Sequence, residues 1–241
     1  RSLYSRNIAN LMMGGRAISA SHMAFGSTRV MATCAVVGQA GGTAAAMAIE
    51  KGITPRDVLQ HIKELQQKLL KDDCFIPGFK NQDDKDLARA AAVTSSSAIE
   101  GGACENVING IARKVKEDTN CWISKELGNG SEWIELALDK PACLSEVHLK
   151  FDSNLSKELM ISLSHNALRK QTPGIPPELV KDYSVEFYLD DSVVNKLDVS
   201  GNCFRFKVHK LDQPLTCDRI RVSVHNTHGD KYARIFEIRA Y

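Results

Sequence analysis

The sequence predicts an α+β protein in which a mostly helical first part is followed by an antiparallel β-sandwich. Hydrophobic residues make up 43% of the 241 residues and charged residues 25%, a balance typical of soluble globular proteins. Apolar residues recur at helical spacing in the first part, whereas from Cys121 onward they alternate with polar ones. We therefore expect two domains, residues 1–95 and residues 96–241.

The clearest helix lies in the stretch "TPRDVLQHIKELQQKLLKDD". Thr54 can cap its N-terminus, and Pro55 suits the first helical turn. The segment "FIPGF" ends the helix, because proline and glycine do not continue it. Its apolar face consists of Val58, Leu59, Ile62, Leu65, Leu69 and Leu70.

Six short segments after Cys121 have the pattern of β-strands with one apolar face. They are "SEWIELAL", "SEVHLKF", "YSVEFYL", "CFRFKVH", "DRIRVSV" and "ARIFEIRAY", with no helical pattern between them. This arrangement predicts an antiparallel β-sandwich of jelly-roll type. The residues expected to face its core are Ile134, Leu136, Leu138, Val147, Leu149, Phe151, Val185, Phe187, Leu189, Phe204, Phe206, Val208, Ile220, Val222, Val224, Ile235 and Ile238.

Charge and cysteine content exclude several classes of function. The net charge of +2, with no dense basic block, argues against a nucleic-acid partner. We find no apolar run near the roughly 20 residues of a membrane span and no targeting leader. The start at Arg1 rather than Met suggests a fragment or a processed product. The seven cysteines form no C-x-x-C pair, so a zinc ribbon is not expected. We expect them to be small buried hydrophobic residues. The sequence does not decide whether Cys104 and Cys121 form a disulfide.

The stretch "GSTRVMATCAVVGQAGGTAAAMA" is unusual because it holds many glycines and alanines and a single charge. Taken as a strand end that turns into a helix, it places Gly38, Gly41 and Gly42 in the turn and first coil. The unpaired N–H groups of such a helix start would accept an anion or an electron-rich ring edge. The alternative is a small-residue helix that packs closely against its neighbours.

A longer segment favours the first interpretation. "NLMMGGRAISASHMAFGSTRVMATCAVVGQAGGTAAAMA" resembles the C-terminal flavin-binding segment of a family of bacterial FAD-dependent oxidoreductases. The family motifs Gly-Arg-x-Ile-Ser-x-x-His, Ser-Thr-Arg-Val-Met and Gly-Gln-Ala-x-Gly-Thr-Ala-Ala occur here in near-unbroken register. The first domain is therefore expected to be a mostly helical fragment of a flavin-binding domain.

The resemblance implies roles for individual residues. Arg29 would contact the flavin by charge, the Gly38–Gly42 turn by backbone N–H groups, and Gln39 and Thr43 by side-chain hydrogen bonds. His22 is the candidate catalytic acid or base beside hydride transfer, or a structural hydrogen-bonding group. Arg16 suits a substrate carboxylate, a cofactor phosphate or a neighbouring Asp. The cofactor-binding residues are thus Arg16, Arg29, Gly38, Gln39, Gly41, Gly42 and Thr43.

One motif of two-dinucleotide-binding flavoproteins is missing. The Gly-x-Gly-x-x-Gly turn that binds the FAD pyrophosphate does not occur in these residues. We therefore expect that the N-terminal flavin-binding portion of the same protein is absent. The isolated chain should neither retain FAD tightly nor be catalytic, and the substrate of the parent enzyme cannot be inferred.

The second part resembles galactose-binding-like, discoidin-type β-sandwiches. The matching features are Asn109-Gly110, Trp122, the strand Trp133 to Leu138 followed by Pro141, and the ending Glu237-Ile-x-x-Tyr241. The resemblance implies a carbohydrate ligand bound by loops at one end, and a structural calcium ion with Asn109 and Glu237 as oxygen ligands. For Trp122 and Trp133 we expect burial rather than a sugar platform.

Three functional interpretations stay open. The favoured one is the C-terminal portion of an FAD-dependent oxidoreductase with an accessory carbohydrate-binding sandwich. The alternatives are a non-enzymatic carbohydrate-binding module of a polysaccharide-processing protein, and a purely structural interaction domain. The resemblance favours an exported or cell-envelope bacterial protein.

Overall fold

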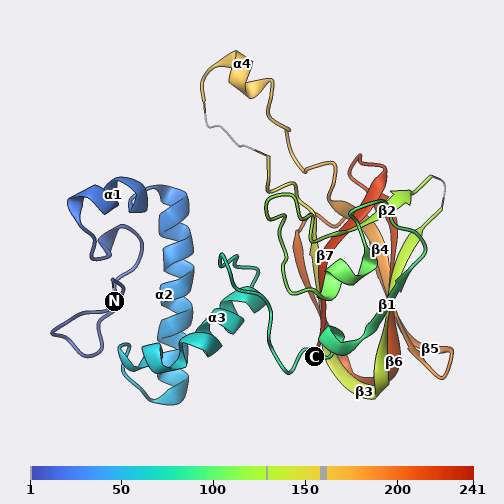
Figure 1. Ribbon diagram of the computed structural model, residues 1–241, viewed down its shortest axis with the longest axis horizontal. Coiled ribbons are helices and arrows are strands. Elements are labelled where there is room, and N and C mark those ends of the chain that lie inside the picture. Colours follow the sequence, from blue (N-terminus) through green and yellow to red (C-terminus); the bar gives the residue numbers. More distant parts are fainter. Residues whose placement is uncertain (1, 129, 158–161) are drawn as a thin grey trace. The chain divides into compact units, whose positions relative to one another are not determined.

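The computed structural model describes residues 2–128, 130–157 and 162–241 (Figure 1). The chain divides into two compact units, Arg1–Asn81 and Gln82–Tyr241. The division falls before the expected boundary at residue 95, because β1 (Ala92–Ser95) pairs with a strand of the second unit. Helices followed by antiparallel strands confirm the predicted α+β class.

The first unit is built around one long helix. Its elements are η1 (Gly15–Ala17), α1 (His22–Thr28), α2 (Met31–Lys51), η2 (Asp57–His61) and α3 (Ile62–Lys71). Gly52 ends α2 in the left-handed conformation (φ 63°), which glycine adopts without steric cost. The small core of this unit joins α2 to α3 and consists of Ala44, Met47, Ala48, Val58, Leu65 and Leu69.

The predicted helix after Thr54 exists, but its first turn is tighter than an α-helix. The hydroxyl of Thr54 donates to Asp57 Oδ2 at 2.7 Å, and the backbone N–H of Thr54 donates to the same oxygen at 3.2 Å. The chain then passes through η2 into α3. Leu59 and Ile62 of the predicted apolar face remain exposed.

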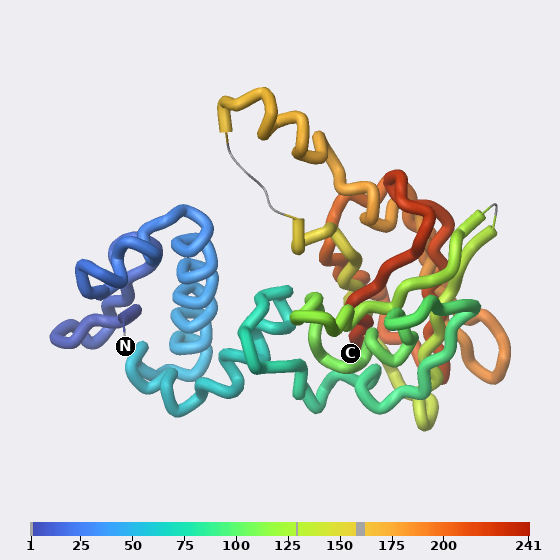
Figure 2. The backbone as a smooth tube through the Cα atoms, turned by 45° about the horizontal axis from the view of Figure 1, so that its top comes forward, coloured from blue at the N-terminus to red at the C-terminus, as the bar shows by residue number. Residues whose placement is uncertain are grey.

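The second unit is an antiparallel sandwich made from one continuous sheet that folds over on itself. Its strands are β1, β2 (Trp122–Glu126), β3 (Glu132–Phe151), β4 (Val180–Leu189), β5 (Ser192–Val199), β6 (Phe206–Thr227) and β7 (Tyr232–Ala240). Short helices η3 (Leu87–Ala90) and η4 (Cys104–Ile108) precede and follow β1, and α4 (His165–Leu168) lies between β3 and β4. Figure 2 shows α4 away from the strands.

The long strands β3 and β6 each contribute to both layers. Their pairing breaks between Ala137 and Ala142 and again after Leu144. The first half of β3 and the second half of β6 form one layer with β1, β4 and β5. The other halves form the second layer with β7 and β2.

A single hydrophobic cluster joins the two layers. Ile134 and Leu136 of the first layer and Leu149 and Phe151 of the second are fully buried in it. Nearly all of the predicted inward positions of β3, β4, β6 and β7 are thus confirmed. The prediction for "CFRFKVH" is wrong, because Phe204 precedes β6 and is 61% exposed, and Val208 is 38% exposed.

Candidate functional site

The glycines of the glycine-alanine stretch do not form a turn. Gly38, Gly41 and Gly42 all lie inside α2, which runs without interruption from Met31 to Lys51. Their N–H groups are therefore within the helix, and the prediction of a strand-to-helix turn at these residues is wrong. The surrounding alanines are the best helix formers, and no proline interrupts them. The start of the helix, with its unpaired N–H groups, lies instead at Met31, two residues after Arg29.

The other predicted flavin-contacting residues lie on or beside α1. His22 is the first residue of α1 rather than part of a loop, and Ser21 caps this helix by accepting from the N–H of Ala24 at 3.3 Å. The Arg16 guanidinium lies 5.5 Å from the centroid of the Phe25 ring. Arg29 ends α1, and its side chain is exposed, as are those of His22 and Arg16.

Gln39 and Thr43 have partners inside the first unit. The Gln39 amide donates to the Asp72 carbonyl at 3.4 Å, and the Thr43 hydroxyl donates to the Gln39 carbonyl at 2.9 Å. The second bond is the usual contact of a helical threonine with the preceding turn. These hydrogen bonds account for both side chains without a ligand.

One face of α2 is lined by exposed residues, all but one of them glycine or alanine, which we call the α2 stripe. It consists of Ala35, Gly38, Gly42, Ala46 and Ile49, spaced three or four residues apart. A Cβ atom added at Gly38 or Gly42 would meet nothing within 4 Å. Glycine in a helix costs about 0.5–1 kcal/mol relative to alanine. No contact within the described part of the chain requires glycine at either position.

By length and composition alone, α2 could cross a membrane. It has 21 residues, and its most apolar 18-residue window has a mean hydropathy of 1.3 with 17% of that window buried. Its sequence does not read as a long apolar run, because alanine and glycine, rather than large aliphatic residues, dominate this stretch. A single such helix is weak evidence, since the core helix of a larger domain meets the same criterion.

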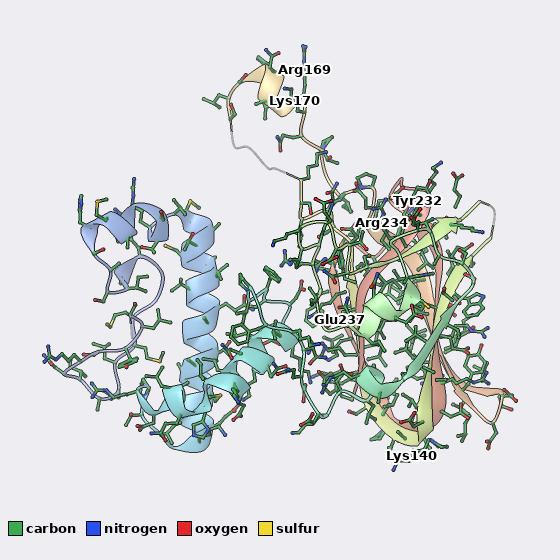
Figure 3. The ribbon with its side chains drawn as sticks, in the orientation of Figure 1. Lys140, Arg169, Lys170, Tyr232, Arg234 and Glu237 are labelled. Atoms are coloured by element: carbon green, nitrogen blue, oxygen red, sulfur yellow. The ribbon has the colours of Figure 1, made fainter. Side chains whose placement is uncertain are left out.

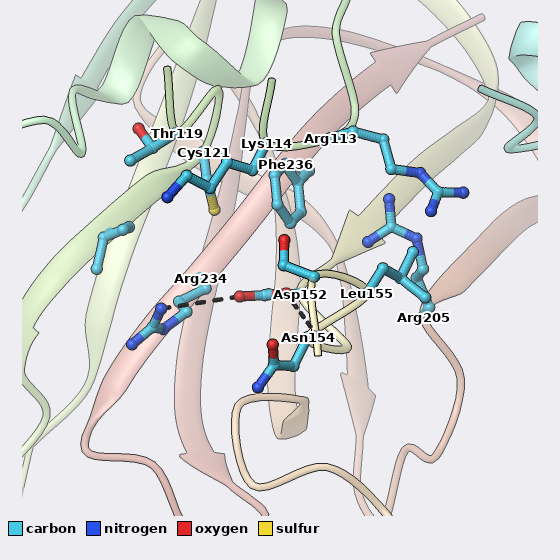
Figure 4. A pocket seen from close by; sticks show the side chains of 12 residues that line it. Arg113, Lys114, Thr119, Cys121, Asp152, Asn154, Leu155, Arg205, Arg234 and Phe236 are labelled. Atoms are coloured by element: carbon cyan, nitrogen blue, oxygen red, sulfur yellow. Dashed lines mark hydrogen bonds and ion pairs between the residues drawn. The ribbon is translucent and has the colours of Figure 1, made fainter. Parts of the chain in front are cut away.

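The β unit contains a pocket of about 240 Å³ on the outer side of β2 and β7 (Figure 4). Strand alternation places Arg234 and Phe236 on the face of β7 that points away from the core, opposite Ile235. The remaining walls come from β2 and the loop before it, the segment after β3 and the residue before β6. They comprise Arg113, Lys114, Thr119, Cys121, Ile123, Asp152, Asn154, Leu155, Ser156 and Arg205.

Asp152 lies in this pocket between Arg234 and Arg205 (Figure 4). Its Oδ1 accepts from the N–H of Asn154 at 2.8 Å, and its Oδ2 lies 3.8 Å from Arg234 Nη1. Burial raises the pKa of Asp152, although the Asn154 N–H and the charges of Arg234 and Arg205 act in the opposite direction. Burial likewise raises the pKa of the neighbouring Cys121 thiol, which is therefore not a reactive thiolate.

Arg205 is held rigidly in the pocket wall. It donates to the main-chain carbonyls of Phe151 at 2.6 Å and Ala112 at 2.5 Å. Its guanidinium carbon lies 5.1 Å from the centroid of the Phe236 ring. A planar cation fixed by two carbonyls and an aromatic ring is well placed to donate to a ligand oxygen.

The predicted calcium ligands have protein partners of their own. Asn109 accepts from the N–H of Ile111 at 2.8 Å and donates to Asn120 at 2.9 Å. Glu237 Oε2 lies 2.7 Å from Lys150 Nζ and 2.9 Å from Arg239 Nε. Burial raises the pKa of Glu237, but these two cations together hold it below its usual value. A carboxylate shared by two cations does not fit a calcium site.

Glu237 is also separate from the pocket along β7. Figure 3 shows Tyr232 and Arg234 together at one end of the strand, with Glu237 farther along. Of the two tryptophans, Trp122 is fully buried, and its indole N–H donates to the Ser97 carbonyl at 2.9 Å. Trp133 is half-buried, and the guanidinium carbon of Arg221 lies 4.5 Å from the centroid of the Trp133 ring. All seven cysteines fall within the described residues and are free thiols.

Sequence reasoning missed the pocket residues Asp152, Arg205, Arg234 and Phe236. One signal was present in "ARIFEIRAY", where Phe236 stands between the two inward isoleucines and out of phase with Ile235. An aromatic residue on the solvent phase of a strand indicates an outer contact or a site. Asp152 and Arg205 lie in connections between strands, where periodicity gives no information.

The first part of the chain matches a known family in sequence. Residues 1–69 match the family model described as FAD dependent oxidoreductase, which confirms the expected resemblance. The match covers η1, α1, α2 and nearly all of α3. No curated protein matches the chain.

Several solved structures that are similar to the chain are carbohydrate-binding modules. One is a Streptococcus pneumoniae fucose binding module, SpX-3 (TM-score 0.49, 13% identity, covering 65% of this chain and 97% of the module). Another is the family 32 carbohydrate-binding module of Streptococcus pneumoniae EndoD (TM-score 0.48, 19% identity, covering 65% of this chain and 99% of the module). A third is the lectin domain of lectinolysin complexed with Lewis B antigen (TM-score 0.48, 12% identity, covering 66% of this chain and 96% of the lectin domain).

Proposed function

We propose that this chain joins the flavin-contacting end of an FAD-dependent oxidoreductase to a β-sandwich that binds a saccharide in the Asp152 pocket. The family match carries the first half of the proposal, and the pocket geometry carries the second. The ligands of similar solved structures belong to those proteins. The argument for this chain therefore rests on its own residues.

The α2 stripe and the start of α2 supply the flavin contact. Gly38 and Gly42 leave space that no side chain of the first unit fills, so a planar ring can approach the helix backbone closely. The N–H groups at Met31, two residues after Arg29, favour negative charge at the ring edge. FAD supplies hydride transfer when bound, and His22 is the residue of this chain that would hold or donate a proton beside it.

This chain holds only part of the flavin site. It contains no Gly-x-Gly-x-x-Gly turn, so further polypeptide must bind the pyrophosphate and adenine. We therefore propose that the isolated chain does not retain FAD and is not catalytic. The protein expressed with any residues encoded upstream of Arg1 should show a flavin absorption spectrum after desalting. A colourless, folded protein would remove the first half of the proposal.

The Asp152 pocket suits a saccharide because it combines a carboxylate acceptor with fixed donors. Asp152 can accept from two neighbouring hydroxyl groups, while Arg205 and Arg234 donate to ring or hydroxyl oxygens. The volume of about 240 Å³ lies just below the ~300–1,000 Å³ of pockets for drug-sized ligands, and so suits a single sugar ring. The site uses neither Asn109 nor Glu237, and we derive no role for calcium in it.

A glycan array probed with the whole chain tests the binding half of the proposal. We expect binding by wild type and loss of at least tenfold in affinity for Asp152→Ala, which removes the acceptor. The control is Asp212→Ala, an exposed Asp in β6 that does not line the pocket. If no saccharide on the array bound wild type, the sandwich would not be a carbohydrate-binding domain.

A further inference from the structure

We infer that a pocket of the helical unit, between residues 4–9 and residues 54–56, binds the phosphate monoester of a small molecule. The pocket has a volume of about 220 Å³, and we call it the Arg6 pocket. Arg6 lines it from the first segment and Arg56 from the second, and none of its lining residues is acidic. The inference concerns a ligand that neither half of the proposed function requires.

Main-chain hydrogen bonds hold both segments of the Arg6 pocket in place. The N–H of Ser5 donates to the Leu11 carbonyl at 2.9 Å, which closes the first segment into a loop. Met12, the next residue, packs against the core that joins α2 to α3. The second segment follows the end of α2, where the N–H of Ile53 donates to the Ala48 carbonyl at 3.0 Å. The two arginines are therefore carried by fixed backbone segments, which lowers the entropic cost of binding a ligand between them.

Two uncharged partners orient the Arg56 guanidinium. Its Nη2 donates to the main-chain carbonyl of Arg6 at 3.1 Å, and its central carbon lies 5.8 Å from the centroid of the Tyr4 ring. Asp57 follows Arg56, but its Oδ2 accepts from both the N–H and the hydroxyl of Thr54. These hydrogen bonds lower the pKa of Asp57 most, and the charge of Arg56 contributes least. Among the residues that the structure describes, Arg56 forms no ion pair, so its charge is available to a ligand.

Arg6 and Ser5 supply further donors to the same pocket. The Arg6 side chain is exposed, and across residues 2–128, 130–157 and 162–241 its guanidinium has no hydrogen bond or ion pair. The Ser5 hydroxyl oxygen accepts from the N–H of Asn7 at 3.2 Å and of Ile8 at 3.1 Å. Its own proton is then free to donate to a ligand oxygen. The Arg6 pocket thus combines two guanidinium groups with a hydroxyl donor.

These donors match a phosphate monoester better than a carboxylate. Near neutral pH the monoester carries a charge of about −2, which balances two arginines, and presents three acceptor oxygens. A carboxylate has a single charge, and one guanidinium fork already satisfies its two oxygens. The volume of about 220 Å³ is several times the ~30 Å³ of a water molecule, so atoms attached to the phosphate also fit.

The Arg6 pocket lies far from the start of α2, where we place the negative edge of the flavin ring. Met31 begins this helix, whereas Arg56 follows its end. A helix of 21 residues is about 30 Å long. A phosphate held by Arg6 and Arg56 is therefore not at the edge of the ring that Met31 would contact.

NMR titration of the whole ¹⁵N-labelled chain at low salt tests the inference. The probes are inorganic phosphate, acetate, and the matched pair glucose 6-phosphate and glucose. We expect both phosphates to shift the amide signals of residues 4–9 and 54–56, acetate to bind at least tenfold more weakly, and glucose to leave these signals unchanged. Phosphate-induced shifts spread over the exposed basic residues of both units would indicate a general attraction of anions and overturn the inference. Acetate binding as tightly as phosphate would do the same.

Arg6→Gln and Lys63→Gln form a matched pair of variants. Because the Arg6 guanidinium has no partner within the described residues, its loss should leave the fold intact. Arg6→Gln should weaken binding of glucose 6-phosphate at least tenfold, as expected for a charge-assisted hydrogen bond. Lys63→Gln removes an exposed charge of α3 outside the pocket and should change the affinity less than twofold. Equal affinities of these two variants would overturn the inference.

Two further measurements define the ligand. Arg56→Lys keeps the positive charge but loses the planar fork, and should weaken binding of glucose 6-phosphate severalfold; unchanged affinity would show that no bidentate contact is made. FAD added as a competitor should not displace glucose 6-phosphate. Displacement at a lower concentration than that of glucose 6-phosphate would assign the pocket to the cofactor pyrophosphate and overturn the monoester. Failure of both phosphates to bind would overturn the inference and leave the flavin and saccharide proposals untouched.

Discussion

Arg234 and Asp152 are far apart in the sequence but adjacent in the sandwich, with 3.8 Å between Arg234 Nη1 and Asp152 Oδ2. Arg234 belongs to β7, and Asp152 directly follows β3. These strands are antiparallel neighbours in the second layer, where Phe151 pairs with Ile235. The register of the sheet therefore places the carboxylate beside the guanidinium, although 81 positions of sequence lie between them.

Saccharide binding should depend on pH in opposite directions for neutral and acidic ligands. Burial raises the pKa of Asp152 above its ordinary value of 3.8, so this carboxyl gains its proton at a pH above 3.8. Galactose needs the carboxylate as an acceptor, and its affinity should fall as the pH decreases through this range. Galactose 6-sulfate stays ionised, and its affinity should rise because the negative charge of Asp152, which lines the pocket, disappears.

The variant Asp152→Asn separates this effect from a general change in the protein. It cannot titrate at this position, so both pH slopes should vanish over the same range. NMR titrations at about pH 4 to 7 would measure the slopes, starting near the ordinary carboxyl value. Parallel slopes for the two ligands would mean that Asp152 does not contact the bound sugar.

The same shifted pKa affects the stability of the β unit. A carboxyl whose pKa is raised by folding contributes stability that is fully present below 3.8 and is lost as the pH rises through the folded-state pKa. Asp152→Asn should therefore remove a pH-dependent component of the free energy of unfolding with this sign. Urea unfolding at several pH values, followed by tryptophan fluorescence, measures it. If the pH dependence of the free energy of unfolding were the same in Asp152→Asn and wild type, Asp152 would not be the group that causes it.

Two phenylalanines of the β unit should differ sharply in their contribution to stability. Phe187 is fully buried in the core, whereas Phe204 is 61% exposed. Phe187→Ala should lower the free energy of unfolding by about 3–5 kcal/mol, and Phe204→Ala by less than about 0.5 kcal/mol. Both tryptophans, Trp122 and Trp133, lie in β2 and β3, so fluorescence during urea unfolding reports this unit alone. Similar losses would mean that the core is misassigned.

The fold was predictable wherever apolar and polar residues alternate regularly along a strand. Ile134, Leu136, Leu149 and Phe187 follow strand alternation, and each is buried as expected. The prediction for Phe204 was wrong, because the alternating pattern begins before the first residue of β6. The pattern alone does not indicate which residues enter the sheet. The sequence pattern also favoured a turn at Gly38. The glycines suggested a break, whereas the helix propensity of the many alanines around them prevails in the structure.

The candidate site was less predictable than the fold. The family resemblance led to Arg29 and the glycines of α2, but the structure changed the local geometry around them. The Asp152 pocket depends on the β3–β7 register and on the loop before β2, which are long-range features of the chain. A single sequence carries no direct signal for residues that only meet in three dimensions.

Gly102 is required by a close approach of two backbone segments. A Cβ atom at this position would lie 2.7 Å from Ile123 Cβ and 3.0 Å from Ile123 N. The two segments are joined by a hydrogen bond from Ile123 N–H to the Gly102 carbonyl at 3.1 Å, so neither can move aside freely. Gly102→Ala should destabilise the β unit by about 1–3 kcal/mol, in the range of overpacking.

Gly130→Ala is the matched control in the same unit. Its added Cβ would meet the Leu127 carbonyl at 3.8 Å, an ordinary van der Waals contact. Urea unfolding monitored by tryptophan fluorescence should show little change for this variant. If Gly102→Ala were as stable as Gly130→Ala, the Gly102–Ile123 contact would not constrain the fold.

Gly42 distinguishes a helix that only packs from one that contacts a flavin. No atom lies within 4 Å of a Cβ placed at Gly42, so Gly42→Ala should stabilise the helical unit of this chain by about 0.5–1 kcal/mol. Thermal unfolding followed by circular dichroism at 222 nm measures this gain. A loss of stability would show that the α2 stripe already contacts another part of the chain.

In the protein expressed with any residues encoded upstream of Arg1, the larger variant Gly42→Leu should lower the FAD content after desalting. The leucine side chain would occupy the space that we assign to the flavin, while the helix itself tolerates leucine well. Lys63→Leu, which adds an exposed leucine to α3, controls for the effect of a new apolar surface. Equal FAD content in both variants and wild type would show that the glycines of α2 serve a purpose other than cofactor approach.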